Sequence, residues 1–436
     1  MAKRNNKQSR RIRNLVLLCS ICAVVLVVST YAWFIGMKTV NVSSFDIEIA
    51  TTEGLFLSMN GNDWYYNLNP NTATAYTGNT NTWASNGLIP MSTVGDMDPV
   101  SSRMKLYEKA SLTTSHGGYR LLASRVQNYA TAGDDKTFVQ GEGYVAFDLF
   151  IKNLSGTEYY EENEPLNEEA IYLTVGSKVE VASDGVKNTG IENSVRVAFA
   201  QVGRVKADTS SVETITGITC AKTEDEDGNV IVTGICRPAQ IWEPNDKDHV
   251  QNAINWYNKS CLARTGADLT LKTSYVTDSS DSCNTISPNT AYATYAVSRE
   301  LTVDDNVDIY DGTDYNKYEN NTKKYASYIE AKESEKNNYK LVEYDYFTDT
   351  EKMVPGAARP EFMKLAPNSI TKVRVYVFIE GQDVDNNDFA SLGQKISIKF
   401  GFTKERYTED DIDYSEDSPS TDITPEGTDI VATQAQ

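Results

Sequence analysis

The chain has 436 residues, with 41 basic and 61 acidic side chains and a formal net charge of −20. Its hydrophobic content of 40% is enough to bury a core, which excludes a wholly disordered chain. The acidic balance excludes nucleic acid as a partner, because no surplus of Lys and Arg is present to neutralise phosphates. With only two histidines, His116 and His249, and no H-E-x-x-H, G-x-S-x-G or phosphate-loop motif, the sequence predicts no enzymatic activity.

The N-terminal 37 residues are typical of an export segment. Residues 1–14 carry six basic side chains and no acidic one, and residues 15–37 form an uncharged run of 23 residues. A helix of that length spans about 35 Å, which is enough for a bilayer core of about 30 Å. The basic flank predicts that the rest of the chain lies at the extracellular face. The run is either an uncleaved membrane anchor or a signal peptide cut by a signal peptidase near Ala32, and the sequence leaves both open.

Alternating apolar side chains predict a chain dominated by β-strands from residue 38 onward. In residues 39–50, Val40 and Val42 alternate in one phase, and Phe45 and Ile47 alternate in the other. The change of phase between them predicts a β-bulge or a junction between two strands. Because the two sets cannot share one face of a regular strand, we expect one half to join the subunit's own sheet. The other half is then free to pair with an open sheet edge of a neighbouring copy.

Four further segments alternate in the same way, at 145–151, 195–199, 373–379 and 396–402. Each predicts a strand that turns one face toward a core. In the third segment, Tyr376 and Phe378 make the second face apolar as well, so we expect a central strand there. Together the segments predict an all-β fold, an antiparallel β-sandwich built from residues 38–204 and 366–407.

Residues 205–365 differ from the flanking segments in composition and patterning, and we interpret them as a mixed insertion or a second subdomain. They hold a helix-like stretch at 246–262 and the four cysteines Cys220, Cys236, Cys261 and Cys283. Cys220 and Cys236 lie symmetrically about Gly228, the middle of a three-residue turn. A hairpin there places the two cysteines opposite each other and predicts a disulfide between them. The other two cysteines then pair by elimination.

Two acidic segments close the chain. Asp383, Asp385, Asn387 and Asp388 supply oxygen atoms in a pattern that suits calcium coordination, so calcium is the one candidate cofactor. The segment lacks the Gly that the sixth position of an EF-hand loop needs, so an ordinary solvated acidic turn is the alternative. Residues 408–436 carry nine acidic side chains and no basic one, which predicts a disordered acidic tail.

Several short segments occur in an order that resembles the TasA/camelysin-type family of exported matrix proteins. They are STYAWF at 29–34, FDIEI at 45–49, LFLSMNG at 55–61, YVAFDLFIKN at 144–153, SVRVA at 194–198 and VFIEGQD at 377–383. The resemblance extends over the two ends of the chain and parts of its middle. Residues 205–365 match nothing in that family.

The resemblance implies a jelly-roll β-sandwich that carries a signal segment for a SipW-type signal peptidase and polymerises into fibres. In such fibres an N-terminal segment of one subunit completes the sheet of the next. Some members are labelled metalloproteases, but that label does not carry over, because this sequence has no paired histidines at metal spacing.

The sequence thus predicts a structural protein of the cell surface or extracellular matrix. We expect it to assemble with itself, or with other surface proteins, through Val40, Val42, Phe45 and Ile47. The alternative is a membrane-anchored adhesin whose 205–365 region binds a glycan or another cell. An exported hydrolase is the third possibility, and it is disfavoured because adjacent acids in loops are ordinarily solvated charge.

Overall fold

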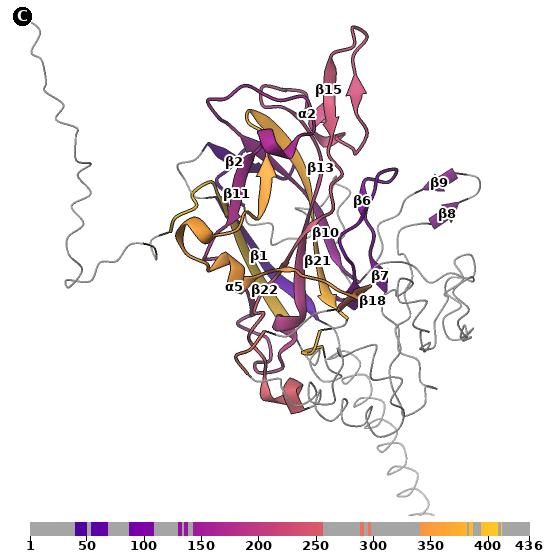
Figure 1. The fold of residues 1–436 in the computed structure, drawn as a ribbon. Coiled ribbons are helices and arrows are strands. Elements are labelled where there is room, and N and C mark those ends of the chain that lie inside the picture. Colours follow the sequence, from indigo (N-terminus) through magenta and orange to yellow (C-terminus); the bar gives the residue numbers. More distant parts are fainter. Residues whose placement is uncertain are drawn as a thin grey trace, which may run out of the picture.

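The computed structural model describes residues 40–49, 54–68, 87–108, 130–132, 135–137, 143–255, 288–291, 295–297, 341–381, 383–386, 394–408 and 411. In this part of the chain two β-sheets pack face to face (Figure 1). The predicted all-β sandwich is therefore confirmed. None of the helices among these residues is both long and apolar enough to cross a membrane. The predicted export segment at 1–37 lies outside the described residues.

The smaller sheet has the strand order β20-β11-β22-β1-β3, with β12 beside β22. Its strands are β1 (Asn41–Ile49), β3 (Asn67–Leu68), β11 (Glu169–Leu173), β12 (Lys178–Val181), β20 (Met363–Leu365) and β22 (Lys395–Thr403). All neighbours are antiparallel except β1 and β22, which run parallel. The first described strand therefore lies beside the last one.

The larger sheet has the strand order β14-β15-β13-β21-β10-β2. These strands are β2 (Leu55–Ser58), β10 (Val145–Asn153), β13 (Val195–Lys206), β14 (Thr223–Glu224), β15 (Val230–Gly234) and β21 (Ser369–Glu380). Four short strands extend it, namely β4 (Pro90–Ser92), β7 (Tyr107–Glu108), β16 (Gln240–Glu243) and β19 (Phe347–Thr348). Every residue of β21 is buried, and β10 and β13 pair with its two sides. The predicted central strand at 373–379 is thus confirmed.

The remaining elements are short. They are the pairs β5 (Met97–Asp98) with β6 (Arg103–Met104), β8 (Ala130–Ala132) with β9 (Asp135–Thr137), and β17 (Tyr295–Val297) with β18 (Leu341–Glu343). The helical elements are α2 (Val212–Thr216), α5 (Asp349–Lys352), η3 (Pro165–Asn167), η4 (Ile191–Ser194) and η9 (Gly356–Ala358). Of the predicted helix at 246–262, residues 251–255 are helical and residues 256–262 lie outside the described part.

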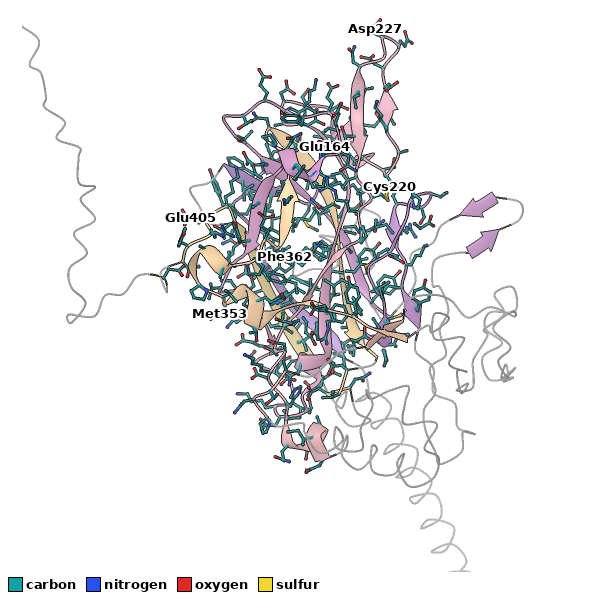
Figure 2. The ribbon with its side chains drawn as sticks, viewed as in Figure 1. Glu164, Cys220, Asp227, Met353, Phe362 and Glu405 are labelled. Carbon is teal, nitrogen blue, oxygen red and sulfur yellow. A yellow bond between two sulfur atoms is a disulfide. The ribbon has the colours of Figure 1, made fainter. Side chains whose placement is uncertain are left out.

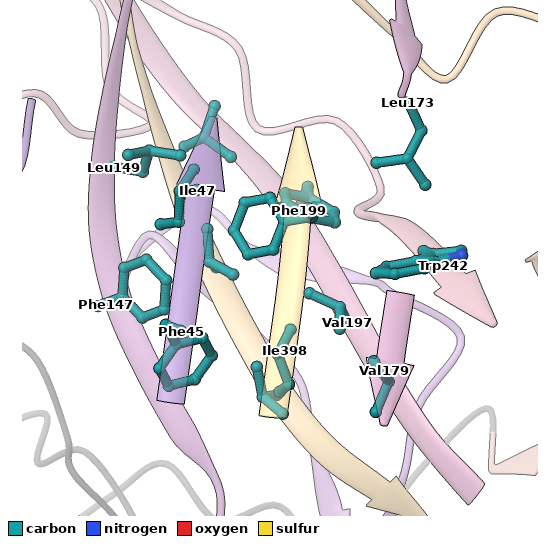
Figure 3. Close-up of a cluster of buried hydrophobic side chains, with 14 of the residues drawn as sticks. Phe45, Ile47, Phe147, Leu149, Leu173, Val179, Val197, Phe199, Trp242 and Ile398 are labelled. Carbon is teal, nitrogen blue, oxygen red and sulfur yellow. The ribbon is translucent and has the colours of Figure 1, made fainter. Parts of the chain in front are cut away.

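Two apolar layers flank the larger sheet. The main core fills the space between the sheets, where Phe45 of β1 meets Phe147 of β10 edge-on with ring centroids 5.5 Å apart (Figure 3). A second cluster, which includes Phe150, Tyr376 and Phe378, covers the outer face of the larger sheet. The central strands of that sheet are therefore buried on both faces, unlike the smaller sheet, whose outer face carries half-exposed polar residues.

The predicted boundaries at 205 and 365 do not coincide with the limits of the sheets. Strands β15, β16, β19 and β20 fall inside that range and pair with strands of the sandwich. Trp242 and Phe362 from the same range are fully buried in the main core. These strands are only two to five residues long, too short for a clear alternation in the sequence.

Candidate functional site

Val40 and the strand β1 that follows it hold the residues predicted to mediate assembly. Val40, Val42, Phe45, Ile47 and Ile49 are between 0% and 7% exposed, and all five belong to the main core of their own chain. Figure 3 shows Phe45 and Ile47 directed toward the larger sheet. The half of the strand that we expected to be free is therefore packed within the subunit in this structure.

A β-bulge explains how both halves share one face. The register between β1 and β22 shifts between Val42 and Ser44, so one extra residue, Ser43, is inserted at this point. The extra residue returns the side chains that follow to the face used by Val40 and Val42. The sequence predicted the phase change correctly. Of the two predicted explanations, the β-bulge is confirmed, and because of it the two halves share a face that they could not share in a regular strand.

Polar contacts fix the register of β1 on the side that faces solvent. The hydroxyl oxygens of Ser44 and Ser397 lie 2.6 Å apart. Glu48 and Lys399 form an ion pair of 2.9 Å, and both side chains are about one third exposed. On its other edge, within the described residues, β1 pairs with the two residues of β3, and Val40, just before β1, forms an isolated bridge with Leu88. The strand is thus held mainly by β22 and by its five buried side chains.

The predicted calcium ligands make other contacts in the structure. Asp383 forms a 2.6 Å ion pair with Arg196 and accepts hydrogen bonds from Ser194 Oγ and the Asp385 amide. Asp385 contacts the His249 ring at 2.7 Å. Among the described residues no group of three or more His, Cys, Asp and Glu side chains can hold a metal ion. Two predicted ligands are therefore paired with basic side chains, and the other two, Asn387 and Asp388, lie outside the described residues.

Arg196 is the centre of a buried charge network on the outer face of the larger sheet. Its side chain has no exposed surface and binds the carboxylates of both Asp383 and Glu243. The hydroxyl of Tyr346 donates to Glu380 at 2.9 Å, and the Arg196 guanidinium lies 5.1 Å from the centre of the Tyr346 ring. Burial alone lowers the pKa of Arg196, but Glu243 and Asp383 outweigh that effect and raise it. Arg196 is therefore cationic at every physiological pH.

His249 and Asp385 share a proton. His249 Nε2 lies 2.9 Å from the Thr290 carbonyl oxygen, which only accepts, so Nε2 carries a hydrogen. The 2.7 Å contact between Nδ1 and Asp385 Oδ2 then needs one further proton. Burial raises the pKa of Asp385 to about 6, and Asp383 adds to this rise while His249 opposes it. Burial lowers the pKa of His249, but the Asp385 contact outweighs it and raises the pKa overall. The pKa of Asp385 is thus raised by burial, and the pKa of His249 is raised by its carboxylate partner.

A polar cleft of about 570 Å³ opens beside this pair. One wall is formed by all four residues of β12, whose outer edge pairs with no other strand of the described chain. His249 lies in the opposite wall, and four asparagines contribute amide groups, namely Asn188, Asn193, Asn245 and Asn289. Asn245 Nδ2 donates to the Val179 carbonyl of β12 at 3.1 Å. The described lining of the cleft thus offers hydrogen-bonding groups and includes no Phe, Tyr or Trp side chain.

The structure joins Cys220 and Cys236 in a disulfide, with Cα atoms 5.1 Å apart. This is the pairing that their symmetry about Gly228 predicts. Strands β14 and β15 form the hairpin, and Gly228 takes the positive φ of +86° that the turn requires. Figure 2 shows Asp227 at the tip of the hairpin and Cys220 at its base. Cys261 and Cys283 lie outside the described residues.

Sequence reasoning missed the role of His249 and Arg196. His249 belongs to no recognisable motif in the sequence, yet its side chain is only 6% exposed. Arg196 occupies the polar phase of a predicted strand and was not singled out. The one indication in the sequence was a basic side chain, Arg196, between two apolar residues of a strand, Val195 and Val197. Such a pattern is typical of a strand with one face in water. In this structure the second apolar layer covers that face, so Arg196 is buried.

Comparison with known proteins gave no match to any protein-family model, to any curated protein or to any solved structure.

Proposed function

We propose that the protein is an exported structural subunit of the cell surface or extracellular matrix, related to the TasA/camelysin-type proteins and sharing their jelly-roll topology. In this proposal β1 of one copy completes the smaller sheet of the next copy. One observation carries it: an N-terminal strand supplies five buried core side chains, yet is held on one edge by a single long partner. Such a strand can leave its own sheet and enter an identical one.

Exchange of β1 preserves every contact that it makes within one chain. The vacated groove on β22 is complementary to the β1 of any other copy, so the inward side chains and the Glu48–Lys399 pair re-form between subunits. Five residues, 50–54, connect β1 to β2. Fully extended, they reach about 17 Å. Donation is therefore restricted to a neighbour in direct contact, which favours a continuous fibre over a loose network.

A pair of cysteines at the facing serines tests the proposal. The full-length variant with Ser44→Cys and Ser397→Cys places two thiols on adjacent strands, where the hydroxyls lie 2.6 Å apart. Oxidation after assembly should give a ladder of covalent oligomers on a non-reducing gel. Oxidation before assembly should lock β1 in its own sheet and prevent filaments. The two single variants are the controls, because they reveal any bridges made by the native cysteines.

Filaments whose oxidised subunits all run as monomers would contradict donation of β1, since the introduced bridge would then lie within one chain. Filaments formed at the normal rate by protein oxidised beforehand would contradict it equally. A protein that forms no filaments under any condition would remove the structural proposal altogether.

The second candidate function, a tethered adhesin, rests on the polar cleft beside β12. Its amide and charged side chains suit hydrogen bonding to a polar ligand. The N-terminus of the exported protein separates the two candidates. A start near Trp33 favours the filament subunit, which needs a released N-terminus, whereas an intact residue 1 or 2 favours the adhesin.

A further inference from the structure

A group of buried basic side chains lies on the outer face of the larger sheet, remote from β1. Lys372 and Arg374 are alternate residues of β21, and Arg103 belongs to β6, which lies beside the larger sheet in Figure 1. The three residues are 9%, 5% and 8% exposed. Asp148 of β10 contacts Lys372 at 3.4 Å and Arg374 at 3.2 Å. Two cations thus contact Asp148, which is 4% exposed, and Arg103 lies close enough to feel its charge. Another described carboxylate, Asp98, is opposite Arg103 in the β5–β6 pair, so the three cations still outnumber the two carboxylates.

Two donors in this group have no acceptor within the described part of the chain. Arg103 Nη1 is buried and makes no hydrogen bond there. The Tyr376 hydroxyl accepts from the Met104 amide at 3.1 Å, so its own proton is available to donate. Lys372 Nζ, by contrast, also donates to the Thr216 carbonyl at 2.9 Å. The group is therefore rich in donors and poor in acceptors, which is rare in protein interiors.

Either a water molecule or an anion can accept hydrogen bonds from these donors, and the net charge of the group distinguishes between the two. A water molecule would accept the hydrogen bonds but leave the excess positive charge, and an uncompensated buried charge is strongly destabilising. Burial lowers the pKa of Arg103, and the neighbouring Arg374 lowers it further, so the two guanidiniums repel each other. An anion satisfies the donors and removes this repulsion.

We propose that Arg103, Arg374, Lys372 and Tyr376 bind an oxyanion of the phosphate, sulfate or carboxylate type. Guanidinium groups hold such anions through paired, charge-assisted hydrogen bonds, and the tyrosine hydroxyl adds a neutral donor. The anion has two possible sources, a free ion or a carboxylate from the chain's own acidic segments such as 408–436. This site is independent of the proposed assembly through β1.

Thermal unfolding of the full-length protein tests the site. Sodium phosphate and sodium sulfate should raise the melting temperature in a saturable way, by about 3 °C or more, relative to sodium chloride at matched ionic strength. A synthetic peptide of residues 408–436 forms the second arm. Stabilisation by phosphate alone identifies a free ion as the ligand, whereas stabilisation by the peptide, reversed by competing phosphate, identifies the chain's own carboxylates.

Arg103→Gln is the decisive variant, because Arg103 Nη1 has no hydrogen-bond partner among the described residues. Without phosphate the variant should melt at the wild-type temperature or above it, since the repulsion of Arg374 is gone. With phosphate the wild type should overtake it, and the affinity of the variant for phosphate should fall at least tenfold. Arg406→Gln, at an exposed arginine outside the group, is the matched control and should respond as the wild type does.

Three results would overturn the proposal. One is the absence of any response to phosphate, sulfate and the peptide. The second is an equal response of the wild type and Arg103→Gln. The third is an equal effect of chloride, which would indicate general screening of the acidic chain rather than a site.

Discussion

Replacing Val40 and Val42 together by aspartate should unfold the sandwich rather than release a folded monomer. The two valines are 0% and 7% exposed and pack in the core between the sheets. Burial of one valine side chain contributes about 1.5–3 kcal/mol, so the pair contributes about 3–6 kcal/mol. Two carboxyl groups at these positions add a further cost, because a buried charge or an unpaired carboxyl is unfavourable. The sum is comparable with the 5–15 kcal/mol that holds a typical domain together.

Urea unfolding followed by circular dichroism measures this effect, and electron microscopy of the same samples records filaments. Asn41→Asp is the matched control, because residue 41 lies between the two valines, is only half-buried and pairs with Lys395 on β22. The control should keep the wild-type midpoint. A double variant with the wild-type midpoint and slope would refute the reasoning. It would show that the first half of β1 lies outside the subunit's own core, as a free donor segment does.

Three further outcomes follow from the contacts of β1 and of the buried charge network. Glu48→Lys and Lys399→Glu each place like charges across β1 and β22, in the monomer and in the filament alike, so each should leave the critical concentration for assembly near the wild-type value. An equimolar mixture should lower that concentration several-fold if strands are donated between copies, because opposite charges then meet between subunits. Mixing that changes nothing would contradict donation. The pKa of His249 is raised on folding, so its stabilising effect is complete below its unfolded pKa of about 6.5 and is lost as pH rises through the folded value. The urea midpoint of the wild type should therefore decrease as the pH rises from 6 to 8. Asp385→Asn, whose amide can donate to neutral His249, should remove most of this pH dependence. A wild-type midpoint that does not change with pH would argue against the shared proton. Arg196→Gln should lower the free energy of unfolding by about 3–5 kcal/mol at pH 7, because its two carboxylates stay buried without their cation, and equilibrium unfolding that finds less than 1 kcal/mol would refute this assignment.

Local patterns in the sequence were sufficient for the strands and for one turn. The apolar character of both faces at 373–379 predicted a central strand, and the structure places that segment in β21, between β13 and β10. The phase change after Val42 predicted the bulge, and the symmetry of two cysteines about Gly228 predicted their bond. In each case the residues concerned lie within about 16 positions of one another, so the geometry of a strand or a turn is sufficient to relate them.

The parallel pairing of β1 with β22 could not be predicted in this way. The two strands are separated by more than 340 residues, and nothing in either alternation specifies its partner. The buried charges were missed for a related reason. Arg196 and Asp148 lie in the polar phase of their strands, which normally faces water. Segments from 89–106, 215–218 and 344–346 build a second apolar layer over that face. The alternation within a single strand gives no indication of such a layer.

This difference between the two sheets bears on which strand can be exchanged. Strands β10, β13 and β21 are buried on both faces, so removing any of them would expose two apolar surfaces and break buried ion pairs. Strand β1 buries one face only, and its outward contacts, such as Glu48 with Lys399, are already partly solvated. Its departure therefore uncovers a single apolar groove and leaves no buried charge without a partner. If a strand is exchanged between copies, the physical chemistry of the two sheets favours β1.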